Sequence, residues 1–110
     1  MISKELLSEV LHKDIYNNKI LEFGYRNKST IWVRTTMAND FVINIYELAH
    51  KYKEWAWSLN FDLQVKRHKN DAFYCVIDER NITFHKSKWG VNEQETIFKA
   101  CQWIFDNKDK

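Results

Sequence analysis

The segment from Asn44 to Asn60 constrains the fold of this chain more than any other. Its apolar side chains recur at steps of three and four residues, at Ile45, Leu48, Ala49, Tyr52, Trp55, Ala56 and Leu59. This spacing predicts a helix of about four turns with one face packed on a core. Asn44 and Glu47 have the spacing of an N-terminal capping pair, and Asn60 suits the left-handed conformation that often ends a helix. The helix is therefore expected to begin and end within this segment, in a chain that contains no proline.

After this helix the apolar side chains change to a period of two. The segment 61–67 alternates apolar and polar residues, which predicts a strand with one buried face. The segment 72–77 is apolar at every position, and this pattern is typical of a strand covered on both faces. We expect further strands at 19–25, 30–36 and 82–85.

Two more helices complete the predicted order. Ser3 can cap a helix over Lys4–Leu11, and Asn92 with Glu95 repeats the capping pattern before a helix that reaches about Asn107. The order is then α-β-β-α-β-β-β-α. Because a strand that is apolar on both faces needs cover on both sides, we predict an α+β fold. Its mostly antiparallel sheet carries helices on both faces, as an α/β/α sandwich.

Residues 1–110 are expected to form a single domain. A length of 110 residues leaves no room for two, and a hydrophobic share of 45% supplies enough material for one core. We expect Trp55 in this core, against a sheet that contains Phe73, Cys75 and Ile77. Cys75 and Cys101 lie in apolar stretches, so both are predicted to be free, buried thiols.

Charge and hydropathy argue against several classes of protein. The chain has 17 basic and 15 acidic residues, a balance too even for a typical duplex-DNA-binding protein. No apolar run approaches the roughly 20 residues that span a bilayer. The charged residues Lys4, Glu5 and Glu9 argue against a signal peptide at the N-terminus. We therefore expect a cytoplasmic protein that has no contact with a membrane.

The sequence contains no recognisable catalytic motif. The histidines are scattered, at His12, His50, His68 and His85, and none belongs to a nucleophile motif. Two glycines cannot form a phosphate-binding loop, and two cysteines without CxxC or HxxxH spacing do not form a zinc site. We predict that the protein is not an enzyme and carries no metal and no cofactor.

Two segments carry a resemblance to a known family. The sequence INIYELAHKYKEWAW at 43–57 and the sequence TIFKACQWIFDN at 96–107 resemble small phage and prophage proteins grouped as the phage alpha-beta-alpha sandwich domain. The matching positions are Ala49, Trp55, Ala56, Ala100, Cys101 and Ile104. The chain departs from the group where Asn92 replaces a proline before the last helix. The resemblance implies a sandwich fold and a mobile-element origin within a bacterial host, and it provides no catalytic residues.

One candidate binding surface lies on the long helix. Tyr46, His50, Lys53 and Trp57 follow one another at steps of four, three and four, on the flank opposite the core stripe. A second layer or a dimer partner could cover this flank, or it could be an exposed patch that binds another protein. Trp89, before the last helix, is a further candidate for the same surface.

A second candidate surface is basic. Lys66, Arg67, His68 and Lys69 crowd one hairpin end. Such a turn can simply protect a sheet edge, or it can contact single-stranded nucleic acid or an acidic partner. Of the two surfaces we favour the aromatic one. The expectation is an accessory protein that binds a protein partner, for instance to inhibit a host or defence factor, with single-stranded nucleic-acid binding as the alternative.

Overall fold

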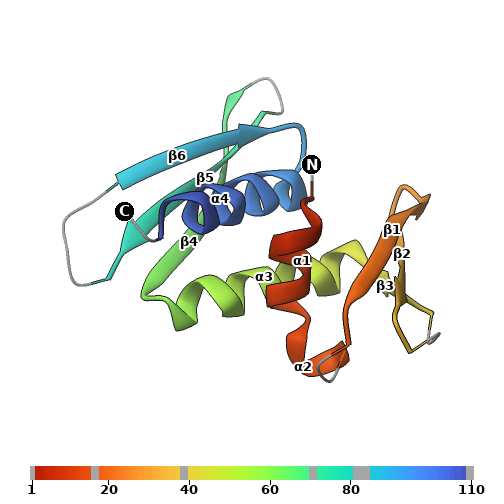
Figure 1. Cartoon of the computed structure of the whole chain (residues 1–110). Helices are drawn as coiled ribbons and strands as arrows, with labels where there is room; N and C mark the ends of the chain where they lie inside the picture. The colour runs from red at the N-terminus through yellow and green to blue at the C-terminus, as the bar shows by residue number, and fades with distance from the viewer. Residues whose placement is uncertain (1, 16–17, 38–39, 70–71, 81–84, 109–110) are drawn as a thin grey trace.

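A computed structural model describes residues 2–15, 18–37, 40–69, 72–80 and 85–108 (Figure 1). Its helices are α1 (Lys4–Val10), α2 (His12–Ile15), α3 (Ile45–Ser58) and α4 (Glu93–Asn107). Its strands are β1 (Ile20–Asn27), β2 (Thr30–Thr35), β3 (Phe41–Asn44), β4 (Phe61–Arg67), β5 (Phe73–Glu79) and β6 (His85–Gly90). The predicted α+β class, the antiparallel pairing and the order of the main elements are confirmed. Of the strand predicted at 82–85, residues 82–84 lie outside the described residues.

The prediction of one continuous sheet is wrong, because the strands form two antiparallel sheets, β1-β2-β3 and β4-β5-β6. The unpredicted strand β3 completes the first sheet, where Ile43 pairs with Ile31 of β2. The helix α3 follows β3 directly and leads to β4, so the two sheets lie at opposite ends of α3 (Figure 1). Because no loop separates β3 from α3, the helix does not turn back along the first sheet, and its fourteen residues carry the chain about 21 Å before β4 begins.

The helices cover one face of each sheet rather than both faces of a single sheet. In the second sheet Leu63 pairs with Ile77, and both side chains are buried with Cys75 under α3 and α4. Tyr74 and Val76 point to the opposite face and are only half-buried. The expectation that 72–77 is covered on both faces is therefore wrong. Aromatic and β-branched residues suit the exposed face of a strand as well as a buried one.

The long helix α3 is capped as predicted. The Asn44 side chain accepts a hydrogen bond from the Tyr46 amide at 2.7 Å, and Asn60 follows the helix with a φ of 71°. Leu48, Tyr52 and Ala56 are buried, which confirms most of the predicted stripe.

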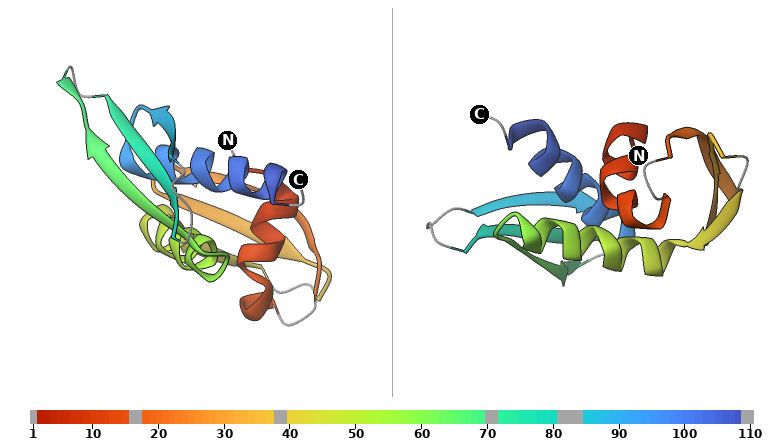
Figure 2. Two further views of the ribbon diagram at one scale, coloured as in Figure 1. Left: turned by 90° about the vertical axis from the view of Figure 1, so that its left-hand side faces the viewer. Right: turned by 60° about the horizontal axis from the view of Figure 1, so that its bottom comes forward.

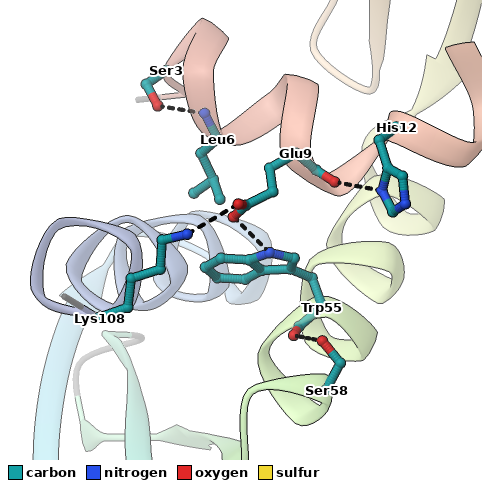
Figure 3. A network of polar contacts seen from close by, with 7 residues as sticks. All are labelled: Ser3, Leu6, Glu9, His12, Trp55, Ser58 and Lys108. Carbon is teal, nitrogen blue, oxygen red and sulfur yellow. Dashed lines mark hydrogen bonds and ion pairs between the residues drawn. The ribbon is translucent and has the colours of Figure 1, made fainter. Parts of the chain in front are cut away.

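Trp55 departs from this stripe and does not enter the core beneath the sheet. It is half-buried between three helices, where its ring lies 6.4 Å from the Phe105 ring of α4. Its indole Nε1 donates to the Glu9 carboxylate of α1 at 2.9 Å, and Lys108 Nζ donates to the same carboxylate at 3.0 Å (Figure 3). The indole N–H explains the difference, because a hydrogen-bond donor needs a partner and the carboxylate provides one at the surface.

The two cysteines are free and buried, as predicted. Cys101 Sγ on α4 lies 3.5 Å from the Tyr52 carbonyl of α3, and the Tyr52 ring meets the Phe98 ring edge-on at 4.9 Å. These contacts hold α3 and α4 together over the second sheet.

Candidate binding surfaces

The four residues predicted on the flank of α3 are brought together and are exposed. Tyr46 is 60% exposed and Trp57 is 50% exposed, and His50 and Lys53 between them also face solvent. His50 Nε2 lies 2.9 Å from the Glu54 carboxylate on the next turn. No described element covers this flank, so the patch formed by Tyr46, His50, Lys53 and Trp57 is available to a partner. We call it the helix patch.

Arg80 fixes the position of Trp57 in the helix patch. The Arg80 guanidinium carbon lies 3.8 Å from the centroid of the Trp57 ring. The same guanidinium donates to Asn60 Oδ1 at 2.7 Å and to the Trp57 carbonyl at 3.3 Å. One face of the indole is therefore held by a cation–π contact while half of the side chain stays exposed. Sequence analysis missed Arg80, since its contact depends on β5 returning to the end of α3.

A groove of about 330 Å³ lies beside Trp57. Its walls come from α3, with His50 and Lys53, and from β4, with Phe61 and Asp62. The groove thus offers an apolar floor and side chains of both charges. An aromatic side chain next to polar side chains is the combination that suits an extended or helical protein segment.

Trp89 lies on another surface. It stands on the outer face of the second sheet, where its ring stacks on Tyr74 of β5 at a centroid distance of 4.8 Å. The His68 ring meets the Trp89 ring edge-on at 5.3 Å. Lys99 Nζ of α4 donates to the Trp89 carbonyl at 3.0 Å and so fixes the backbone. The structure therefore joins Trp89 to the basic hairpin and not to the helix patch.

The basic residues Lys66, Arg67 and Lys69 lie at the end of β4, and all three are exposed. Lys66 pairs in register with Tyr74, which pairs in turn with Trp89. This end of the β4–β5 hairpin extends beyond the helices (Figure 2). Tyr74 was missed as a site residue because it lies within an apolar run. Tyr74 alternates along β5 with the buried residues, and this alternation is the signal that could have placed it on the outer face.

The groove beside Trp55 has a structural role. About 480 Å³ in volume, it lies between the N-terminal helices and α3. Its carboxylates each have a basic partner: Glu9 with Lys108, Asp14 with Lys51, and Glu54 with His50. Because Glu9 ties α1, α3 and α4 together, we interpret this network as a stabilising contact between helices (Figure 3).

The buried side chains are held in their neutral forms. Burial raises the pKa of the Cys75 thiol to about 12, and it also raises the pKa of the Cys101 thiol well above its ordinary value. Since the thiolate is the nucleophilic form, neither cysteine is activated at neutral pH. The described residues contain no group of three or more His, Cys, Asp or Glu side chains placed to hold a metal ion. None of the described helices is long and apolar enough to cross a membrane.

Comparison with protein-family models, with curated proteins and with solved structures finds no significant match to this chain.

Proposed function

We propose that this protein is a non-enzymatic accessory protein that binds another protein through the helix patch. The observation that carries this proposal is the position of Trp57. Its ring is held 3.8 Å from the Arg80 guanidinium carbon, yet half of the side chain is exposed. An isolated protein seldom gains from holding a large apolar side chain at its surface, whereas a binding protein does.

The composition of the patch favours a protein partner. Trp, Tyr and Arg are the residues that most often contribute large binding energies at protein interfaces, and all three occur here as Trp57, Tyr46 and Arg80. A side chain that is already fixed loses little conformational entropy when the partner binds. The mixed charges of the adjacent groove, with Lys53 and Asp62, suit the polar rim of such an interface.

The resemblance to the phage alpha-beta-alpha sandwich domain supports a particular setting. In this proposal the protein is encoded by a phage or prophage and acts in the cytoplasm of the bacterial host. Its partner is then a host or defence factor that it inhibits. A second copy of the chain is the other protein that could occupy the patch, and the experiment below separates these two outcomes.

Binding is tested with a double variant, Trp57→Ala with Tyr46→Ala. We expect each truncation to weaken the complex by at least about tenfold, and the double variant to abolish it. Capture from bacterial lysate followed by mass spectrometry identifies a foreign partner, and light scattering after size-exclusion chromatography measures self-association. Circular dichroism checks that the variants fold.

The matched control is Tyr25→Ala, which truncates a tyrosine of similar exposure on the first sheet. It should leave the complex unchanged. If the double variant keeps its partner while a Lys66→Gln, Lys69→Gln variant loses it, the helix patch is not the contact surface.

A further inference from the structure

The outer face of the second sheet carries a row of side chains with a distinct chemistry. Leu63, Cys75 and Ile77 are buried under the helices, so residues one position away point to the opposite, solvent-facing side. Register places Lys66, Tyr74 and Trp89 side by side across β4, β5 and β6, and the next row is Gln64, Val76 and Ser87. We call the first row, together with His68, the sheet patch.

Three rings of the sheet patch are in contact. Tyr74 and Trp89 stack with their planes 31° apart at 4.8 Å, and His68 meets Trp89 at 5.3 Å with planes 75° apart. Trp89 is 50% exposed, and the backbone beneath it is fixed by Lys99. The sheet patch is thus an aromatic platform with a fixed backbone at the surface, and half of the Trp89 side chain is open to solvent.

Positive charge lies next to this platform. Lys66 stands in its row and Lys69 follows His68 at the hairpin end, whereas Arg67 pairs with Phe73 and lies on the alternate side of β4. At the opposite end of the same face Asp62 of β4 pairs directly with Asp78 of β5, and His85 of β6 is in the same row. The lysines and the carboxylates among the described residues thus lie towards opposite ends of the face, and a negatively charged ligand is attracted to the hairpin end.

We infer that the sheet patch is a binding site for single-stranded nucleic acid. Unpaired bases stack on exposed aromatic rings, and phosphates are neutralised by neighbouring Lys and Arg side chains. In a duplex the faces of the bases are already stacked on one another, so a duplex can use the cations but not the rings. Only single-stranded nucleic acid can contact both the aromatic rings and the lysines of the patch. This site is separate from the helix patch and does not depend on the function proposed for it.

The polarity of the face also sets the direction of the bound strand. Neighbouring rows of side chains are roughly 7 Å apart along a strand, so the Asp62–Asp78 row lies about 14 Å from the row of Trp89. A chain of phosphates that ran along the strands would approach these carboxylates. The nucleic acid therefore crosses the sheet from β4 to β6, and two or three bases contact the platform, as on other sheets that stack bases.

Fluorescence anisotropy with labelled oligonucleotides tests this inference. The probes are a single strand of about 12 nucleotides, as DNA and as RNA, and the same sequence as a duplex. We expect the single strand to bind more tightly than the duplex. Trp89→Ala should weaken binding by about 5- to 100-fold, Trp89→Phe should keep most of the affinity, and Trp89→Leu should not.

Two control variants separate the site from general effects. Trp32→Ala truncates a tryptophan on the outer face of the first sheet and should leave binding unchanged. Lys66→Gln with Lys69→Gln should lower the slope of log affinity against log salt by about 1.4, the value for two phosphate contacts on a single strand. Lys13→Gln with Lys28→Gln removes the same charge elsewhere and should lower that slope little.

Several results would overturn the inference. If Trp89→Ala and Trp32→Ala bind the single-stranded oligonucleotide with equal affinity, the aromatic platform is not part of the binding site. Equal binding of duplex and single strand would show simple attraction of a polyanion, and tight binding of polyglutamate would identify an acidic protein as the ligand. If the unaltered protein captures no partner but binds the oligonucleotide through Trp89, only the proposed function is contradicted. If it captures a partner but does not bind the oligonucleotide, only this inference is contradicted.

Discussion

Each of the two sheets carries a tryptophan on its outer face, and the two rings are held in different ways. Trp32 of β2 lies against Gly24 of β1, where a Cβ atom would be only 3.0 Å from the ring. Trp89 of β6 has no such space below it and stacks instead on the Tyr74 ring. The Trp32 ring lies in the space that a side chain at position 24 would fill, whereas the Trp89 side chain is 50% exposed.

The charges around the two rings differ as well. On the first sheet Glu22 and Arg34, in the row next to Trp32, form an ion pair across β1 and β2, so these two charges neutralise each other. On the second sheet Lys66 stands in the same row as Trp89, and the carboxylates that the described residues place on that face, Asp62 and Asp78, lie at its other end. A surface tryptophan therefore does not by itself indicate a binding site. The role of such a tryptophan depends on the residue beneath its ring and on the charges around it.

The largest predicted effect concerns the inner faces of the two sheets. Ile31 and Val33 of the first sheet cannot ionise, whereas burial raises the pKa of Cys75 in the second sheet from 9.0 to about 12. This thiol contributes stability that is fully present below about pH 9 and is lost as the pH rises towards 12, because the unfolded chain releases the proton first. By pH 10.5 the free energy of unfolding should fall by about 2 kcal/mol from Cys75 alone.

Urea unfolding at pH 8 and pH 10.5 measures this loss. The matched variant Cys75→Ala lacks the thiol and should lose correspondingly less stability on the same change of pH. Equal losses in the two proteins would show that Cys75 is not held neutral beneath the second sheet.

A smaller effect, a difference of about 1 kcal/mol between two variants, distinguishes the two tryptophans directly. Trp32→Ala should lower the free energy of unfolding by about 2 kcal/mol, because the ring covers Gly24 and packs on the strand. Trp89→Ala should lower it by about 1 kcal/mol, the value of one aromatic pair. Urea unfolding at neutral pH compares them. If Trp89→Ala proves the more destabilising, its ring is part of the core packing and not a platform.

The smallest predicted effect is the difference in stability between alanine variants of the two glycines, one in each sheet. A Cβ atom at Gly90 would lie 3.1 Å from the Thr96 backbone nitrogen at the start of α4, which cannot easily move. Gly90→Ala should therefore cost about 1–2 kcal/mol. At Gly24 the Cβ atom would meet only the Trp32 ring, which can shift, so Gly24→Ala should cost less. Thermal unfolding of both variants checks the order, and the reverse order would mean that the Trp32 ring is the more firmly fixed group.

The elements defined by local signals could be predicted from the sequence. Asn44 and Asn60 mark the ends of α3, and β4 has the predicted bounds because its period of two begins directly after Asn60. Ser3 and Asn92 cap α1 and α4 as expected. In each case a capping side chain or an alternating pattern specifies the element within a few residues of sequence.

The arrangement of the sheets could not be predicted in this way. The strand β3 is four residues long and ends in the residue that caps α3, so its apolar residues also fitted a helix entry. The division into two sheets follows from the direct continuation of β3 into α3 and not from any local pattern. The contact of Tyr74 with Trp89 depends on the register of β5 and β6, and the contact of Trp57 with Arg80 depends on where β5 ends. The sequence therefore predicted Trp57, Trp89 and the basic hairpin as candidates, but not the side chains that contact the two tryptophans.

The most direct test of the contrast between the two sheets is a titration of the ¹⁵N-labelled protein with the single-stranded oligonucleotide, followed through the indole N–H signals. The chain has five tryptophans, and each gives one signal. We predict that the Trp89 signal shifts or broadens on binding, while those of Trp32, Trp55 and Trp57 stay in place. Movement of the Trp32 or Trp57 signal with an unchanged Trp89 signal would contradict the assignment of the second sheet's outer face as the nucleic-acid site.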